Sequence, residues 1–196
     1  MNDDYSQAGQ DRFVSSLIRD DAQHYFLDVG CWVPRRLNNT LLLEEKGWNG
    51  ISIDILDFKR EWASRQTAFI MADALALDYE VLLNNNKFPS IIDYLNVDIE
   101  GEGLRFAALK KIFESSRKFK IITIEHDAYR DYYETERKPQ RDFLNKAGYQ
   151  LVCGDVCATG NPFEDWWINP EFFGYDEYQH LICEKQDYNK ILNKLK

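Results

Sequence analysis

Short apolar runs alternate with amphipathic segments along most of the chain. Runs rich in β-branched and aromatic residues are typical of buried strands, whereas apolar residues at helical spacing predict helices. The pattern predicts strands at residues 25–29, 51–53, 68–71, 91–97, 119–124, 149–152 and 180–183. It predicts helices at residues 38–46, 58–65, 79–83, 104–113 and 137–146.

This alternation predicts an α/β fold with three layers, in which helices cover both faces of a mostly parallel, seven-stranded sheet. The chain contains no internal repeat and no linker, so we expect a single domain over residues 1–196. Residues 158–178 hold Trp166 and Trp167 among several other aromatic side chains. We expect this segment to be an aromatic-rich cover loop over the sheet edge, where it would also wall an apolar pocket.

The composition indicates a soluble globular protein. The chain has 24 Lys and Arg against 33 Asp and Glu, a net charge of −9, and 44% hydrophobic residues. This acidic balance disfavours nucleic acids and anionic membrane surfaces as partners. No apolar run approaches the roughly 20 residues that span a bilayer, and the polar N-terminus is unlike a signal peptide. We therefore expect a cytoplasmic protein whose four cysteines are reduced thiols.

Acidic residues follow five successive predicted strands. They are Asp28, Asp54, Asp73, Asp98 and the triplet Glu125, His126 and Asp127. Right-handed crossovers bring the carboxyl ends of parallel strands to one edge, where open α/β sheets bind their ligands. A buried core does not need carboxylates there. The sequence therefore predicts a polar ligand site at this edge, although Asp54 could instead cap a helix and Asp28 and Asp98 could be structural acids.

The second strand ends in Asp54, where a carboxylate can accept hydrogen bonds from both ribose hydroxyls of a nucleoside cofactor. The first turn reads DVGCWVP and lacks the later glycines that let a backbone approach a pyrophosphate. A cofactor with a ribose and no phosphate fits better, and S-adenosylmethionine is one. An NAD-type oxidoreductase remains a disfavoured alternative.

Six segments together resemble the FkbM-type methyltransferases, which use S-adenosylmethionine and have the Rossmann-like class I fold. They are SQAGQDRFV (6–14), FLDVGCW (26–32), NNTLLLEEKGWNGISIDI (38–55), FIMADAL (69–75), YLNVDIEG (94–101) and ITIEHD (122–127). The chain departs from the family at Cys31-Trp32-Val33-Pro34, which replaces a glycine-rich turn, and at Glu102-Gly103 after the DIEG step.

The resemblance implies the site residues. Asp28 and Gly30 would line the methionine side of the cofactor together with Asn39 and Thr40, and Asp98 would also contact the cofactor. Asp54 would hold the ribose, Ile55 would flank the adenine, and Asp73 and Ala74 would bind its polar edge. Residues 1–24 would form an N-terminal helix or lid that places Gln7 and Gln10 over the cofactor.

The expected reaction is an in-line methyl transfer to a hydroxyl of a small molecule or sugar, with S-adenosylhomocysteine as product. A hydroxyl acceptor needs a base, for which His126 is the first candidate, followed by Asp98, with Glu125 beside them. A divalent metal on these strand ends is a second, less favoured way to activate the hydroxyl.

Two other interpretations of the function stay open. The chain could be a non-catalytic cofactor-binding partner protein, or, less favoured, a metal-dependent hydrolase that uses the same acids. The sequence also leaves the oligomeric state open, a homodimer included.

Overall fold

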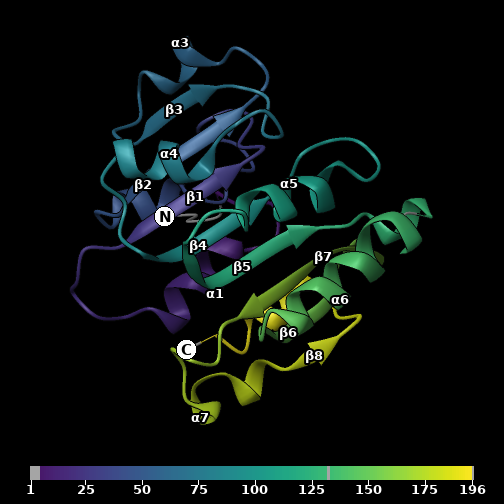
Figure 1. The fold of residues 1–196 in the computed structure, drawn as a ribbon. Coiled ribbons are helices and arrows are strands. Elements are labelled where there is room, and N and C mark those ends of the chain that lie inside the picture. Colours follow the sequence, from purple (N-terminus) through teal and green to yellow (C-terminus); the bar gives the residue numbers. More distant parts are fainter. Residues whose placement is uncertain (1–4, 132, 196) are drawn as a thin grey trace.

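The computed structural model describes residues 5–131 and 133–195. One eight-stranded sheet runs through the molecule in the order β3-β2-β1-β4-β5-β7-β6-β8 (Figure 1). The strands are β1 (Tyr25–Val29), β2 (Asn49–Asp54), β3 (Ala68–Met71), β4 (Ile91–Val97), β5 (Lys118–Glu125), β6 (Gln150–Ala158), β7 (Asn161–Ile168) and β8 (Cys183–Glu184). The first five pair in parallel, and β7 lies antiparallel between β5 and β6.

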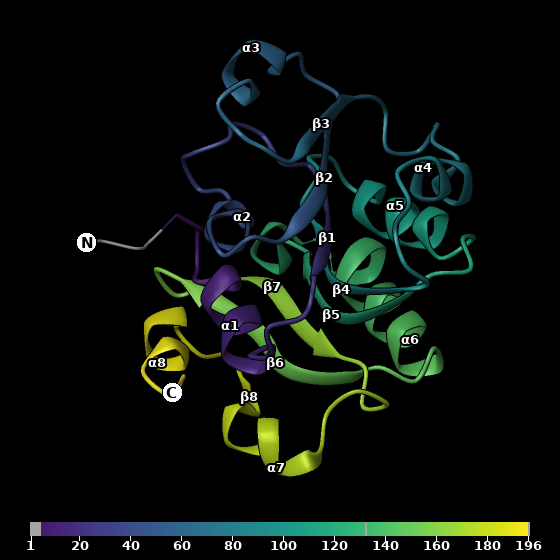
Figure 2. The ribbon, with the colours of Figure 1, turned by 90° about the vertical axis from the view of Figure 1, so that its left-hand side faces the viewer.

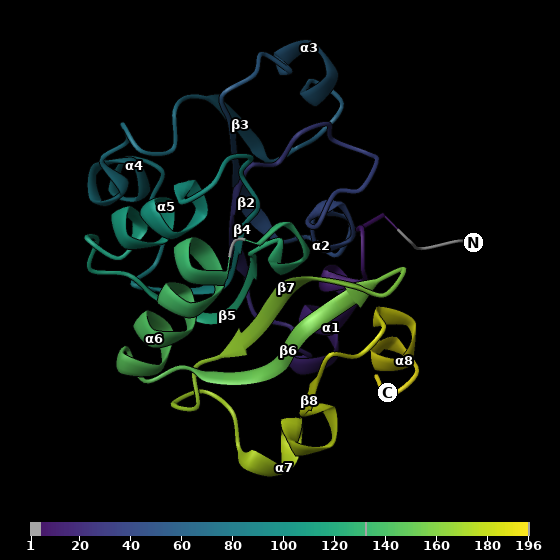
Figure 3. The same ribbon diagram turned by 90° about the vertical axis from the view of Figure 1, so that its right-hand side faces the viewer.

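Helices cover both faces of this sheet, as Figures 2 and 3 show in edge-on views. One face carries α4 (Tyr79–Asn85), α5 (Leu104–Ile112) and α6 (Lys138–Lys146), and the other carries α1 (Gln10–Leu17), α2 (Leu41–Glu45) and α8 (Tyr188–Leu192). The short helices α3 (Lys59–Trp62) and α7 (Tyr175–Tyr178) lie at the two ends of the sheet. The predicted three-layer α/β fold is therefore confirmed.

Alternation along the strands supplies a core on each side of the sheet. In β1, Phe26 joins the cluster that contains α1 and α2, and its neighbour Leu27 joins the cluster under α4 and α5. In β7, Trp166 and Trp167 divide in the same way, and both are fully buried. The buried apolar residues of the strands thus divide between two cores, which explains why the central strands read as nearly continuous apolar runs.

The strand β7 corrects one expectation. We expected residues 158–178 to be a cover loop, but Asn161–Ile168 forms an inner strand of the sheet, which raises the strand count from seven to eight. The segment contains Glu164 and Asp165, which a sequence pattern places in water. Both are buried because distant side chains hydrogen-bond them: Gln10 reaches Glu164, and Arg141 reaches Asp165.

The last predicted strand also differs. Residues 180–183 were expected to be a strand, but Gln179–Leu181 forms a turn of 3-10 helix and β8 is the short piece Cys183–Glu184. Two further helical turns, η1 (Ala128–Arg130) and η2 (Tyr133–Arg137), connect β5 to α6. Within the described residues, no helix has the length and apolar character needed to cross a membrane.

The N-terminal segment packs against the sheet. In α1, Phe13 and Val14 are fully buried, and the Phe13 ring centroid lies 4.8 Å from that of Trp166. Gln10 is buried and donates a hydrogen bond to Glu164 at 2.8 Å. We expected Gln10 in a lid, whereas it belongs to the core; Gln7 alone of the two reaches the cavity described below.

Candidate functional site

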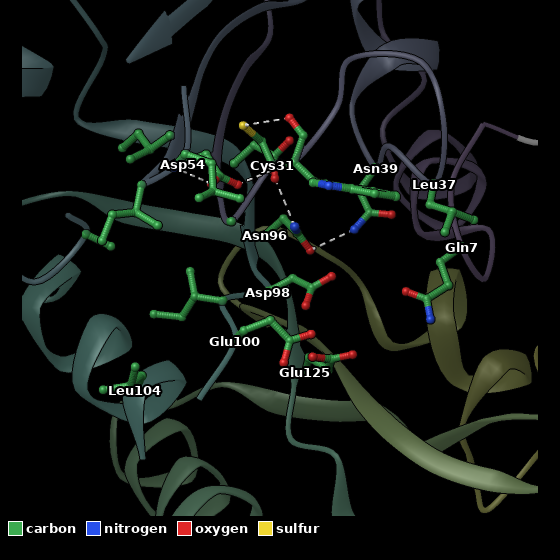
Figure 4. A pocket seen from close by; sticks show the side chains of 18 of the residues that line it. Gln7, Cys31, Leu37, Asn39, Asp54, Asn96, Asp98, Glu100, Leu104 and Glu125 are labelled. Atoms are coloured by element: carbon green, nitrogen blue, oxygen red, sulfur yellow. Dashed lines mark hydrogen bonds between the residues drawn. The ribbon is translucent and has the colours of Figure 1, made fainter. Parts of the chain in front are cut away.

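A cavity of about 670 Å³ opens at the carboxyl ends of the parallel strands (Figure 4). The strand order reverses between β1 and β4, and ligands of open α/β sheets bind in the crevice at such a reversal. The lining follows the strand ends: Asp28 and Gly30 from β1, Asp54 and Ile55 from β2, Asp73 and Ala74 from β3, Asn96 and Asp98 from β4, and Glu125 and Asp127 from β5. Its size is in the range of small-molecule and cofactor pockets.

The cavity gathers most of the residues that the sequence singled out. All the expected cofactor residues line it except Thr40, and so do the expected catalytic residues Asp98 and Glu125. Thr40 lies directly behind the wall, where its hydroxyl donates to Asp28 Oδ2 at 3.1 Å. His126 is fully buried and is not part of the lining. The strand-end pattern therefore locates the cavity but places one candidate base outside it.

The turn after β1 requires glycine at position 30. Gly30 has φ 87°, a left-handed conformation, and a Cβ there would lie 1.9 Å from the Asp98 carbonyl oxygen. The Gly30 and Cys31 amides both donate to the Ile53 carbonyl, at 2.8 and 3.2 Å. The turn is thus hydrogen-bonded to β2 on one side and packs closely against the end of β4 on the other.

Asp54 fixes the loop that follows this turn. Its Oδ2 accepts from the Trp32 amide at 2.8 Å, and its Oδ1 accepts from the Leu56 amide at 2.9 Å. The helix α3 begins after Phe58, so Asp54 is not its cap. Each carboxylate oxygen keeps further acceptor capacity toward the cavity. Trp32 belongs to the Cys31–Pro34 turn, where the sequence differs from the FkbM-type pattern. It lines the cavity and is 41% exposed.

Asp28 is oriented from behind by two neutral side chains. Asn96 donates to its Oδ1 at 2.9 Å, and Thr40 donates to its Oδ2. Burial raises the pKa of Asp28 to about 6, against the opposing effect of these hydrogen bonds. Asn39 Nδ2 donates to the side-chain oxygen Oδ1 of Asn96 at 3.2 Å, while its own Oδ1 is buried without a hydrogen-bond partner among the described residues.

Asp98 and Glu125 form a hydrogen-bonded carboxyl pair at the ends of the adjacent strands β4 and β5. Burial and the charge of Asp98 raise the pKa of Glu125 to about 9. Burial likewise raises the pKa of Asp98 to about 6, although the hydrogen bond from Glu125 opposes the rise. Near neutral pH the pair therefore holds one proton, on Glu125, and Asp98 is a carboxylate.

Beneath this pair lies the buried guanidinium of Arg105. It donates to Glu125 and, at 3.0 Å, to Asp127 Oδ2. Arg105 stands at the start of α5, and nothing in the sequence pattern indicated that it reaches the strand ends. Asn96, by contrast, could have been found, because it lies two residues before Asp98 and so on the same face of β4.

His126 belongs to a separate buried cluster. Its Nε2 lies 3.4 Å from Asp165 Oδ1 and 3.5 Å from Asp155 Oδ1, and its Nδ1 accepts from the Ala128 amide. These three side chains offer ligand atoms close enough together to hold a metal ion. However, the guanidinium groups of Arg137 and Arg141 already pair with both carboxylates, and they would repel a cation. The cluster is therefore an ion-pair network of the core.

Comparison with solved structures shows the fold. No family model matches the chain, and no curated protein sequence matches it. An rRNA methylase from Streptococcus thermophilus superposes with a TM-score of 0.50 at 12% identity, over 82% of this chain and 93% of that one. An uncharacterised protein from Listeria monocytogenes gives 0.55 at 11% identity, over 89% and 74%.

A third similar structure was solved with a ligand. The 1,6-didemethyltoxoflavin-N1-methyltransferase of Burkholderia thailandensis, which holds its substrate and S-adenosylhomocysteine, gives a TM-score of 0.50 at 13% identity, over 83% of this chain and 77% of that one. The chain thus has the Rossmann-like fold of class I methyltransferases, with its cavity at the strand ends of that fold.

Proposed function

We propose that the protein is an S-adenosylmethionine-dependent methyltransferase that acts on a hydroxyl group of a small molecule. One observation carries the proposal: the carboxylates expected to bind the cofactor, on four different strand ends, line one cavity of about 670 Å³. The class I methyltransferase fold supports it, and so does the FkbM-type resemblance, which we propose as the family. The free thiols of the described cysteines agree with the proposed cytoplasmic setting.

The cavity's polar groups fit the parts of this cofactor. Asp54 retains acceptor capacity for the two ribose hydroxyls, and the exposed Asp73 on the next strand end can accept from the adenine amino group. Asp28 and the unpartnered Asn39 Oδ1 can accept from the methionine ammonium. An unpartnered buried acceptor costs free energy unless a ligand donor reaches it.

The residues at the other end of the cavity supply the base. When bound, S-adenosylmethionine supplies a methyl group on a cationic sulfur, which is already activated for transfer. Asp98, ionised near neutral pH, can take the proton of an acceptor hydroxyl while Glu125 stays protonated and holds Asp98 in place. The buried Arg105 fixes Glu125 and Asp127 from below. We therefore assign the base to Asp98 and a positioning role to Glu125, in place of the buried His126.

Calorimetric titration tests the cofactor. We expect S-adenosylmethionine and S-adenosylhomocysteine to bind with micromolar affinity and NAD to show no heat of binding. Binding of NAD alone would overturn the proposal in favour of an oxidoreductase. Binding of neither cofactor would overturn it as well and would favour the partner-protein reading. Binding of S-adenosylhomocysteine with no methyl transfer to any hydroxyl acceptor would leave only the cofactor-binding part standing.

A further inference from the structure

The cavity is lined by many acids and one base. Among the described residues, the carboxyl side chains that line it are Asp28, Asp54, Asp73, Asp98, Glu100, Glu125 and Asp127, and the one basic lining residue is Arg130. The proposed function uses Asp28, Asp54 and Asp73 for the cofactor. The remaining acids stand at the ends of β4 and β5, where the acceptor has to bind. Glu125 keeps its proton, and the buried Arg105 pairs with Asp127, so Arg105 offsets only one of the three charged acids Asp98, Glu100 and Asp127. The remaining negative charge would repel an anionic acceptor and attract a cation.

Arg130 is the protein's own cation at this wall. Its Nε lies 3.6 Å from Asp127 Oδ2, and its Nη1 lies 3.8 Å from Glu100 Oε2. The side chain is 46% exposed, and its guanidinium lies 5.3 Å from the centroid of the Tyr129 ring. The Arg130 Nε donates its one short hydrogen bond in this set to the Tyr129 hydroxyl, at 2.9 Å. Its contacts with the two carboxylates are longer than the about 2.7–2.9 Å of direct charged hydrogen bonds. A ligand cation that hydrogen-bonds Glu100 and Asp127 directly would therefore compete with Arg130 for these carboxylates.

Apolar side chains also line the cavity. Leu37, Leu104 and Tyr129 line it and remain 46, 40 and 44% exposed. Leu37 also has φ 50°, a left-handed conformation that is unfavourable for a bulky residue and is found most often at functional sites. In Figure 4, Leu37 lies on the same side of the cavity as Gln7, and Leu104 lies beyond Glu100. An acceptor here meets an apolar frame around an acidic floor.

We propose that the methyl acceptor carries an ammonium group on an apolar or aromatic body, and that Glu100 and Asp127 bind this ammonium in the place of the Arg130 guanidinium. This inference rests on the proposed function and names the substrate class of the same site. The reacting hydroxyl would face Asp98, while the ammonium, fixed at the rim by charge, would set the orientation of the acceptor. The Tyr129 ring face, vacated by Arg130, adds a cation–π contact.

Three phenols of nearly the same shape separate charge from shape. Tyramine is cationic, para-ethylphenol is neutral and para-hydroxyphenylpropionate is anionic. Each is titrated into protein saturated with S-adenosylhomocysteine, so that binding is measured without turnover. We expect tyramine to bind roughly tenfold tighter than para-ethylphenol, the difference that hydrogen bonds to charged groups typically give. The propionate should bind weakest, and added salt should reduce the preference.

Two substitutions with opposite expected effects test the placement. Glu100→Gln removes one carboxylate and should weaken tyramine binding about threefold to fivefold, as for an exposed ion pair, with para-ethylphenol unchanged. Arg130→Gln removes the competing cation and should strengthen tyramine binding by a similar factor. Glu102→Gln is the matched control, because Glu102 is exposed and near Glu100 but outside the cavity lining, and it should change neither phenol.

The outcomes separate the two proposals. Failure of S-adenosylhomocysteine to bind overturns the proposed function before any phenol is added. If S-adenosylhomocysteine binds and the three phenols bind equally, or the propionate binds best, the acceptor class proposed here is wrong while the methyltransferase proposal stands. Equal effects of Glu100→Gln and Glu102→Gln would show that overall charge, and not the Glu100 position, selects the cation.

Discussion

Glu125 donates a hydrogen bond to Asp98 across the ends of two adjacent parallel strands. The two strands are in register just before this point, where Val97 pairs with Ile124. Two carboxyl groups this close cannot both ionise at low cost, so one keeps a proton. Burial and the charge of Asp98 favour the proton on Glu125, although the Arg105 guanidinium opposes this, and Asp98 lies half-buried at the cavity. In this pair, the carboxylate of Asp98 faces the cavity as a base, and the protonated Glu125 lies behind it.

This arrangement predicts different outcomes at the two positions. Glu125→Gln keeps an amide that can donate to Asp98, so it mimics the protonated acid, and we expect turnover within about threefold of the wild type. Asp98→Asn removes the base, and we expect turnover to fall about a hundredfold or more. Steady-state kinetics measures both. Equal losses in the two variants would contradict the assignment of the base to Asp98.

The pH dependence follows from the same carboxylate. Asp98 has a pKa of about 6, so it is protonated below that pH and cannot accept a proton. We expect the turnover of the wild type to decline as the pH falls through about 6, at saturating cofactor. Glu125→Gln should keep an acid limb, because Asp98 is still present. The residual turnover of Asp98→Asn should not decline in this pH range. The same decline in that variant would show that a group other than Asp98 titrates.

Cofactor affinity should depend on Asp54. Asp54→Asn preserves an oxygen for one backbone amide but loses the second acceptor and the charge, so we expect S-adenosylmethionine to bind roughly tenfold to a hundredfold more weakly. Calorimetry measures the change, and a thermal melt checks that the loop remains folded. Glu61→Gln, an exposed acid of α3 outside the cavity lining, is the control and should bind as the wild type does.

His126 should matter for stability. Removing its imidazole leaves Asp155 and Asp165 with one neighbour fewer in a fully buried network, so His126→Ala should cost about 3 kcal/mol of unfolding free energy. Denaturant unfolding measures this, and the exposed His180→Ala is the control. Turnover measured on the folded variant should stay within about fivefold of the wild type. A hundredfold loss of turnover at unchanged stability would instead restore His126 as the base.

The buried Glu164 predicts a pH-dependent stability. Burial raises its pKa to about 8, although Trp166 and Gln10 both donate to its Oε2, at 2.7 and 2.8 Å. A raised pKa means that the folded state binds the proton more tightly, so this contribution to stability is complete in acid and is lost as the pH rises to about 8. We expect the melting temperature to fall between about pH 5 and pH 8 and Glu164→Gln to flatten that fall. An equally steep fall in the variant would assign the effect to other acids.

Much of the frame was predictable because each strand carries a local signal. The run at Ala68–Met71 is apolar throughout and the run at Ile91–Val97 is mostly apolar, and both predicted strands match the observed ones residue for residue. The acids that follow β1 to β4 face the cavity because parallel strands share one carboxyl edge. Local sequence signals therefore predict both the carboxyl edge of the sheet and the cavity beside it. These signals are the periodicity, the strand length and the residue at the end of each strand.

The remainder depended on partners that are distant in sequence. The strand β7 contains two acids, and hydrogen bonds from Gln10 and Arg141, which lie in other elements, help to offset the cost of burying them. His126 lies between two cavity-lining acids in sequence, but it points to the opposite side because successive strand residues alternate. Arg105 enters the site from a helix whose sequence reads as an ordinary amphipathic segment. Local patterns cannot report such contacts, because each is made by a residue far away along the chain.

The antiparallel strand β7 also determines when the cavity can form during synthesis. The amides of His126 and Asp127 both donate to the Phe163 carbonyl, at 2.7 and 3.0 Å, so the acidic floor after β5 is fastened to a strand made nearly forty residues later. A nascent chain that has produced β1 to β5 can pair those strands, but the segment after Glu125 then lacks the backbone hydrogen bonds to Phe163 and keeps the side-chain contact with Arg105. Contacts between distant segments form slowly, because the chain between them must be ordered first. The strand ends that carry Asp28, Asp54 and Asp73 would thus be in place before the end of the cavity beside β5 is fastened.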